Sequence, residues 1–211
     1  MDNLKIRCSA LGKLMTNPRK KDEILSQTAK TYIRGLVKEI VYNYDPEFTS
    51  KETEKGKDVE SQSIDLYNEV FFTNYKKNTE RKTNDFLTGE CDIDAPEKII
   101  DIKSPWSKKT FPATAEEGVN KDYEWQLRGY MWLFDKDSAE IAYCLVNTPE
   151  YLIEYEQNKT IHEVDEIAPE LRVTVLKIER DTELEELIKQ KVLAARDYAE
   201  WYEKQIINKN Q

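Results

Sequence analysis

The 211-residue sequence is poor in the residue types that most often build metal clusters and covalent cross-links. It has a single histidine, His162, which leaves almost no material for histidine-based catalysis or a histidine-rich metal site. We expect His162 to be a hydrogen-bonded or an exposed side chain. The three cysteines, Cys8, Cys91 and Cys144, are odd in number and far apart, which argues against a disulfide framework, a zinc site and an iron–sulfur cluster. We expect Cys91 and Cys144 to be small buried side chains.

Long apolar runs are also absent from the sequence. No run approaches the ~18 residues that a membrane helix needs, and the N-terminus lacks the charged and apolar regions of a signal peptide. These features predict a cytoplasmic protein without membrane contact. The length fits one domain over residues 1–211, and a hydrophobic content of 39% is enough for a substantial core.

The net charge of −9 is unfavourable for a protein that binds phosphate groups. Its distribution is uneven, because residues 150–211 hold fifteen acidic and nine basic residues. Short basic clusters in the earlier part of the chain are candidates for a local basic rim, although such clusters are usually solvated surface. They are residues 19–21, 76–77, 81–82 and 108–109.

Hydrophobic periodicity predicts an α/β fold with a mixed central sheet flanked by helices. Helices are expected at 21–44, where Asp45-Pro46 ends the helix, at 123–133, at 149–159 and at 181–207. Apolar or alternating strands are expected at 139–148 and 171–178. Residues 106–120, with mixed charge and a proline, are expected to form a loop beside the functional face.

The stretch from Phe86 to Pro105 contains the main candidate metal-binding and catalytic residues. It predicts two short strands, 86–93 and 98–102, with a turn between them. Asp92 ends the first strand, while Asp101 and Lys103 lie two residues apart on the second and therefore share a face. Two carboxylates on one face repel each other unless a cation joins them, and hard ions such as Mg²⁺ prefer such oxygens. The alternative is a hairpin with a solvated polar face.

Two polar side chains lie on stripes that are otherwise apolar. Glu60 follows Gly56 and precedes Ile64 at helical spacing, which makes it either a third acidic group of the site or an exposed residue on a rotated helix. Gln126 lies among aromatic residues of the helix at 123–133 and needs hydrogen-bond partners there. An active-site lysine, a water or the scissile phosphate would supply them.

The N-terminal segment offers an anion site. Ser9 precedes an apolar run and is predicted to cap a short helix. Its hydroxyl, together with Arg7 and the helix N-terminal amides, is also suited to hold a 5′-phosphate. The two roles are compatible.

Four motifs then occur in a characteristic order: G-K-x-x-E ending at Glu60, G-E-x-D ending at Asp92, D-I-K-S-P from Asp101, and Q-L-x-G-Y-M-W from Gln126. In this order they resemble the YqaJ-type viral recombinase family, the family of the phage lambda exonuclease within the PD-(D/E)XK nuclease superfamily. The resemblance extends from about Arg7 to the C-terminal helix. It implies the restriction-endonuclease-like fold of that superfamily.

The resemblance also assigns metal ligands. Asp92 and Asp101 would coordinate the cations, with the backbone carbonyl of Ile102 as an extra ligand and Glu60 supporting the metal–water network directly or indirectly. Asp101 stands where the lambda enzyme has Glu, a change that the superfamily signature allows. Asp92 has the family spacing to D-I-K, although its neighbours Glu90 and Asp94 remain alternatives.

The catalytic and substrate-binding roles follow from the same likeness. Lys103 would orient or activate the attacking water, and Gln126 would help to position Lys103 and the phosphate. Ser9 matches the phosphate-binding serine of the family, with Arg7 beside it.

The resemblance implies a Mg²⁺-dependent deoxyribonuclease, with Mn²⁺ as a substitute, that hydrolyses phosphodiester bonds by a two-metal mechanism. It would digest linear duplex DNA from 5′ to 3′ and leave 3′ single strands for an annealing protein and recombination. Family likeness also implies a homo-oligomer, a ring trimer. The alternatives are a non-catalytic module of the same fold that binds DNA ends or protein, and a related endonuclease or repair nuclease.

Overall fold

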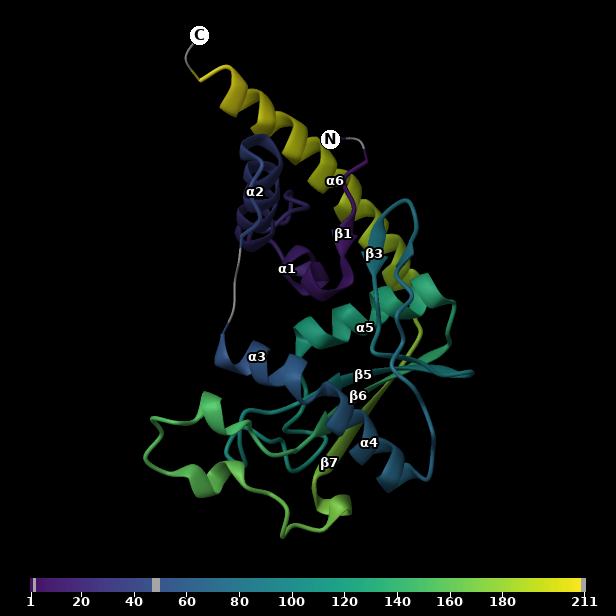
Figure 1. Cartoon of the computed structure of the whole chain (residues 1–211). Helices are drawn as coiled ribbons and strands as arrows, with labels where there is room; N and C mark the ends of the chain where they lie inside the picture. The colour runs from purple at the N-terminus through teal and green to yellow at the C-terminus, as the bar shows by residue number, and fades with distance from the viewer. Residues whose placement is uncertain (2, 47–49, 210–211) are drawn as a thin grey trace.

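A four-stranded mixed sheet forms the centre of the molecule, for which a computed structural model describes residues 1, 3–46 and 50–209 (Figure 1). Its strands, in spatial order, are β4 (Ile93–Asp94), β5 (Lys98–Lys103), β6 (Ser138–Cys144) and β7 (Val173–Glu179). β5 and β6 are parallel, whereas β4 and β7 run antiparallel to their neighbours. The predicted mixed sheet and the strands near 98–102, 139–148 and 171–178 are confirmed.

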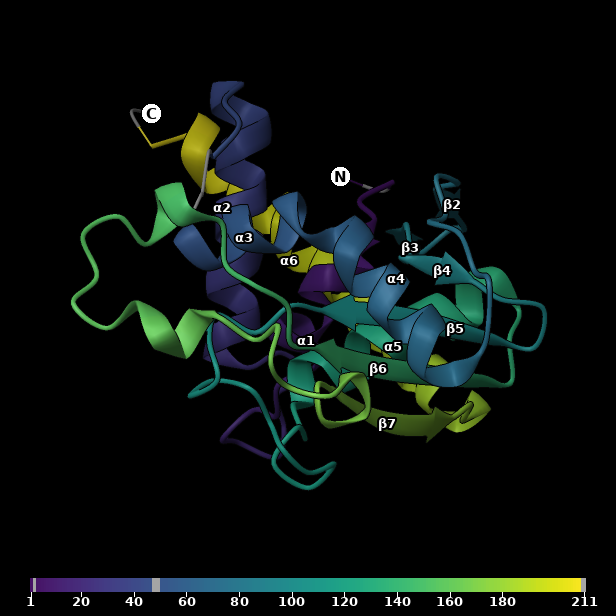
Figure 2. The ribbon, with the colours of Figure 1, turned by 60° about the horizontal axis from the view of Figure 1, so that its bottom comes forward.

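Helices cover both faces of this sheet (Figure 2). α5 (Lys121–Phe134) connects the parallel strands β5 and β6 and packs on one face, and α4 (Glu60–Phe71) packs on the other. The side chains of β5 alternate accordingly: Ile99 joins the apolar core beneath α5, and Ile100 joins the core beneath α4. The same alternation directs Asp101 toward α5, which determines where the polar site forms.

A second, three-stranded sheet lies beside the first, with the order β1 (Ile6–Arg7), β3 (Leu87–Gly89), β2 (Lys82–Thr83). The predicted continuous strand 86–93 is therefore wrong, because its two halves, β3 and β4, belong to different sheets. Close packing holds β3 in place: a Cβ on Gly89 would meet the Tyr130 ring at 2.7 Å. Asp92 lies in the connection between the sheets, directly before β4.

The remaining helices pack together around the larger core. α6 (Thr182–Ile207), the helix expected at 181–207, is capped by Asp181, runs along α2 (Gln27–Tyr42) and contacts α1 (Leu11–Met15) (Figure 1). The expected start of the second helix at residue 21 is wrong, because Ser26 accepts a hydrogen bond from the Ala29 amide at 3.0 Å and caps the helix there. The helix ends at Tyr42, before Asp45-Pro46, with Asn43 in the left-handed conformation.

Short helical turns fill the connections. They are η1 (Cys8–Ala10), η2 (Glu150–Leu152), η3 (Lys159–His162) and η4 (Pro169–Leu171), with the α-helix α3 (Lys51–Asp58) before α4. The helix expected at 149–159 is wrong, since the range holds only the short turn η2 and the first residue of η3. An isolated segment of that length is too short to be a stable helix without a packed face. The three cysteines are buried and unpaired. None of the described helices is long and apolar enough to cross a bilayer.

Candidate active site

A cavity of about 690 Å³ opens at the carboxyl end of β5, the usual place for a site in a sheet with parallel strands. We refer to it as the acidic cavity. Its polar lining brings together most of the residues that the sequence singled out. These are Glu60, Asp92, Asp101, Lys103 and Gln126, together with Lys57 and Lys77 and, among others, Tyr123 and Tyr143.

Asp101 and Lys103 share one face of β5, as their spacing predicts. The Lys103 Nζ lies 2.5 Å from Asp101 Oδ2 and 4.7 Å from the centre of the Tyr123 ring. Burial by itself would lower the pKa of Lys103, but the carboxylates of Asp101 and Asp92 outweigh it and raise the pKa to about 12. Lys103 is therefore an ammonium group at neutral pH.

Asp92 approaches the same strand from the connection before β4. Its Oδ2 accepts a hydrogen bond from the Ile102 amide at 2.6 Å. Burial, and then repulsion by Asp101, raise the pKa of Asp92 to about 7, although Lys103 and the Ile102 amide act in the opposite direction. Two carboxylates are thus held together at a cost that a cation would remove.

Gln126 on α5 binds the carboxylate of the site. Its Nε2 donates to Asp101 Oδ1 and to the Tyr130 hydroxyl, each at 3.1 Å, and the side chain is buried. As the sequence predicts, the buried Gln126 has hydrogen-bond partners, and the protein groups that serve are Asp101 and Tyr130. Gln126 thus orients Asp101, and among the described residues its side-chain oxygen accepts no hydrogen bond from Lys103.

Glu60 reaches the cavity by a route that differs from the predicted one. The expected stripe from Gly56 through Glu60 along one helix is wrong, because α3 ends at Asp58 and Glu60 begins α4. The Glu60 carboxylate forms an ion pair with Lys77, and 22% of its side chain is exposed. The sequence marked Lys77 only as part of a basic cluster, and no local pattern indicated this contact.

Asp92 rather than its neighbours faces the cavity. Glu90 pairs with Arg81 at 3.3 Å, and Asp94 pairs with Lys136 at 2.9 Å. Neither acid lines the acidic cavity. The spacing argument for Asp92 therefore agrees with its position.

The residues present suit a hard divalent cation. Asp101 Oδ2 is buried, and no hydrogen-bond donor of the described residues is aligned with it, although the Lys103 ammonium lies close. The Lys98 carbonyl accepts from the Ala95 amide on the β4 side of β5, so the carbonyl of Ile102, four residues on, faces the same edge as Asp92. No third His, Cys, Asp or Glu in the described residues completes a ligand cluster. Mg²⁺ commonly uses one or two carboxylates plus waters and substrate phosphates, so this donor set fits it.

Comparison with solved structures identifies the family. No protein-family model matches the sequence, and no curated protein matches it. The crystal structure of a phage-related exonuclease from Haemophilus somnus 129PT is 36% identical and superposes with a TM-score of 0.91, with 97% of each chain covered. This chain belongs to the same phage exonuclease family. The YqaJ-type and lambda exonuclease relationship predicted from the motifs is thereby confirmed.

The fold of the family extends to more distant exonucleases. An alkaline exonuclease from Laribacter hongkongensis is 16% identical, with 97% of this chain and 92% of that chain covered and a TM-score of 0.68. The same enzyme in complex with dAMP gives a TM-score of 0.69. These likenesses confirm the restriction-endonuclease-like α/β fold expected from the sequence.

This family member has a second cavity, of about 580 Å³, beside the first. Arg7, Ser9, Arg81 and Tyr130 line it. The predicted helix cap by Ser9 is wrong: α1 has Ala10 at its N-cap position, with no side-chain hydrogen bond. Ser9 instead lies in η1 and is exposed toward this hollow. The Tyr130 hydroxyl, bound to Gln126, joins the second cavity to the acidic one.

Proposed function

We propose that the protein is a divalent-metal-dependent DNA exonuclease that hydrolyses phosphodiester bonds with Mg²⁺, for which Mn²⁺ can substitute. The observation that carries the proposal is the convergence of Asp92, Asp101 and Lys103 in one cavity, with Asp101 oriented by Gln126. Membership of the phage exonuclease family supports it. The proposal includes that residues 1–211 form a single nuclease domain.

The metal-binding groups are oxygen atoms from two chain segments. Asp92, Asp101 and the carbonyl of Ile102 would hold the cations, and Glu60 would act on their water shell. When bound, such ions neutralise charge on the phosphate and lower the pKa of a bound water. Gln126 keeps Asp101 in place before the ions arrive, because one Asp101 oxygen is already bound to its amide.

Lys103 would donate hydrogen bonds to the attacking water or to the phosphate. Its raised pKa keeps the ammonium charged. A charged donor beside the reacting phosphate orients the attacking water and stabilises the negative charge that develops in the transition state. A role as general base requires that bound cations first weaken the hold of Asp101 and Asp92 on its proton.

The second cavity supports a direction of digestion. Ser9 and Arg7 offer a hydroxyl and a guanidinium, which suits a terminal phosphate, while Arg81 lies in the same cavity paired with Glu90. A 5′-phosphate held there would place the first internucleotide bond toward the acidic cavity, which gives 5′-to-3′ digestion of linear duplex DNA. The 3′ single strand left behind would serve an annealing protein in recombination, and the enzyme would act as a ring trimer.

The test is digestion of linear duplex DNA with a 5′-phosphate, with each strand labelled in turn, beside a closed circular duplex. We expect Mg²⁺-dependent release of nucleotides from the 5′-phosphorylated strand, no attack on the circle, and no activity in EDTA. Lys103→Ala should reduce the rate by about 10²-fold or more. Lys177→Ala, at a lysine that is 75% exposed and lies outside the acidic cavity, is the matched control and should leave the rate unchanged.

Each other outcome has a definite meaning. Cleavage of the closed circle would replace the exonuclease with an endonuclease. Binding of DNA ends without cleavage, in Mg²⁺ and in Mn²⁺, would reject the enzyme and leave a DNA-end-binding module. Equal activity of Lys103→Ala and the wild type would reject the assigned site.

A further inference from the structure

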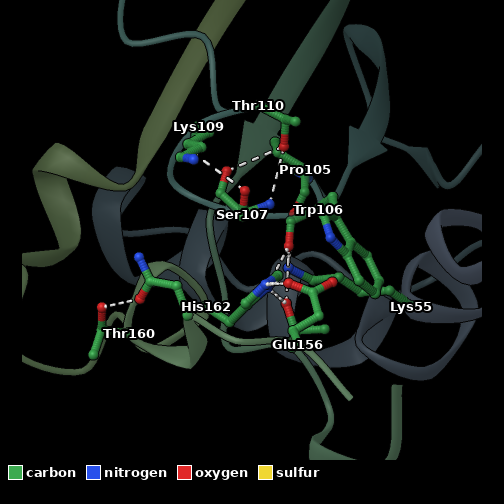
Figure 3. A network of polar contacts seen from close by, with 11 residues as sticks. Lys55, Pro105, Trp106, Ser107, Lys109, Thr110, Glu156, Thr160 and His162 are labelled. Carbon is green, nitrogen blue, oxygen red and sulfur yellow. Dashed lines mark hydrogen bonds and ion pairs between the residues drawn. The ribbon is translucent and has the colours of Figure 1, made fainter. Parts of the chain in front are cut away.

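Lys55 is a fully buried lysine beside the acidic cavity. It lies on α3 and has no exposed surface. Its Nζ lies within hydrogen-bond distance of the backbone carbonyl oxygens of Pro105, at 2.7 Å, and Trp106, at 3.1 Å (Figure 3). It also lies 3.0 Å from the carbonyl oxygen of Val146. An ammonium group has three protons, so these bonds use all of its donor capacity.

The position of Lys55 is unfavourable for a charged group. No ion pair among residues 1, 3–46 and 50–209 includes its ammonium, and burial lowers the pKa of Lys55 to about 8. A buried cation without a counter-ion is costly, whereas an apolar side chain of similar length would fill the same space without that cost. The benefit of a lysine at this position must therefore come from the backbone carbonyl groups that its ammonium holds in place.

Three side chains lie within hydrogen-bond distance of the Trp106 carbonyl oxygen. Besides Lys55, the Thr148 hydroxyl lies 2.9 Å from this oxygen and His162 Nδ1 lies 3.1 Å from it. Nε2 of His162 lies 2.8 Å from Glu156, and because a carboxylate only accepts, this nitrogen carries a proton (Figure 3). The only histidine of the chain is thus hydrogen-bonded, one of its two predicted states.

These contacts act on the loop that leaves β5 directly after Lys103. Residues 104–106 line the acidic cavity beside Lys103. The loop is also tied farther along, where the Lys108 amide donates to the Ile161 carbonyl at 3.0 Å. A displacement of about 1 Å at a reacting group can cost about 10²-fold in rate, so the position of this loop matters for catalysis.

We propose that Lys55 is a positioning residue of the nuclease, which together with Thr148 and His162 fixes residues 104–106 and thereby the place of Lys103. The role rests on the proposed nuclease function and involves no contact between Lys55 and substrate. It makes α3 and the segment from Thr148 to His162 supports of the active site. A purely structural lysine would instead affect the stability of the fold without changing the rate.

The test compares Lys55→Met with Lys191→Met. Lys191, on α6, is also buried and binds backbone carbonyls, with its Nζ 2.7 Å from Thr16 O, but it does not line the acidic cavity. Both changes remove a buried ammonium and keep a flexible chain of similar length. Hydrogen exchange of the amides at 107–111 and the kcat and KM for 5′-phosphorylated duplex are measured at a temperature at which circular dichroism shows both variants folded.

In Lys55→Met we expect exchange at residues 107–111 to accelerate at least ~10-fold, because the loop opens more often. We expect kcat to fall about 10- to 100-fold with KM within about threefold of the wild type. Lys191→Met should retain wild-type exchange in the loop and wild-type kcat. Thr148→Val removes one donor to the Trp106 carbonyl, so it should also accelerate exchange at 107–111 and lower kcat, each by less than Lys55→Met does. If Lys55→Met does not fold, Thr148→Val takes its place in the test.

Unchanged exchange at 107–111 in Lys55→Met would overturn the proposal whether or not the protein cleaves DNA. Unchanged kcat in an active enzyme would overturn it as well, as would equal effects of Lys55→Met and Lys191→Met on both quantities. A wild type that cleaves no DNA would reject the proposed function, and hydrogen exchange alone would then decide whether Lys55 holds the loop.

Discussion

Asp92→Asn should make the metal-free protein more stable while removing its activity. The substitution deletes a charge that faces Asp101 and keeps a side-chain oxygen that can accept from the Ile102 amide, the bond seen at 2.6 Å. Repulsion between the two carboxylates is a cost of folding in the absence of a cation. The neutral amide removes that cost, and it removes a proposed metal ligand at the same time.

The magnitude follows from the pKa of Asp92, which is raised from 3.8 to about 7. About three pKa units correspond to about 4 kcal/mol at most. The folded state binds this proton more tightly, so the stabilisation by protonated Asp92 is complete below pH 3.8 and is lost as the pH rises through about 7. Relative to the wild type, Asp92→Asn should therefore gain stability at both pH 5 and pH 8, with the larger gain at pH 8, where the wild-type carboxyl is ionised.

Urea unfolding in EDTA at pH 5 and pH 8 measures both values. Asp94→Asn is the matched control, because Asp94 pairs with Lys136 away from the acidic cavity, and it should not be stabilised. Saturating Mg²⁺ should raise the stability of the wild type and not that of Asp92→Asn. The reasoning fails if Asp92→Asn is no more stable than the wild type at pH 8 in EDTA, or if its advantage is the same at both pH values.

Two further substitutions test single features. Glu60→Gln breaks the ion pair with Lys77, whose side chain is 52% exposed. The free energy of unfolding should therefore change by less than about 1 kcal/mol. The nuclease rate should fall about 10- to 100-fold if Glu60 supports the metal–water network. An unchanged rate would exclude that role. The second substitution is at Phe72, which follows the last residue of α4 with φ 54° and is 96% exposed. Phe72→Gly should raise the unfolding free energy by about 1 kcal/mol in a thermal or urea titration. Phe72→Ala, which keeps the Cβ, should give no such gain, and an equal gain would refute the backbone explanation.

Local patterns predicted the parts of the site that depend on a single element. Asp101 and Lys103 share a face because a strand repeats every two residues, whatever packs around it. The C-terminal helix begins after Asp181 because a carboxylate there binds the first free amides. Both predictions rest on geometry that a few adjacent residues determine.

The parts that failed depend on contacts between distant segments. Glu60 was placed on one helix with Gly56, but the chain turns at Val59 without a proline or glycine to mark the break. The strand expected at 86–93 divides because its halves pair with different partners, and pairing is set by the rest of each sheet.

The burial of Lys55 likewise depends on contacts with distant segments and cannot be predicted from the local sequence. On the strongly polar helix α3, a lysine is predicted to be solvated, and only the carbonyl groups of distant segments explain its burial. Those segments lie about fifty and ninety residues farther along the chain, beyond the reach of helical or strand periodicity. The identity of the residue therefore gave no indication of its role.

The acidic composition of the chain and a nucleic-acid substrate are reconciled by the local charge of the acidic cavity. Its charged lining residues are Glu52, Glu60, Asp92 and Asp101 against Lys57, Lys77 and Lys103. Four carboxylates and three ammonium groups give a formal charge of −1, which repels a phosphate, whereas one divalent cation changes it to +1. The same ion removes the repulsion between Asp92 and Asp101 that raises the pKa of Asp92. If the proposed ion binds, attraction of DNA to this cavity would depend on the metal more than on the surface charge of the whole protein.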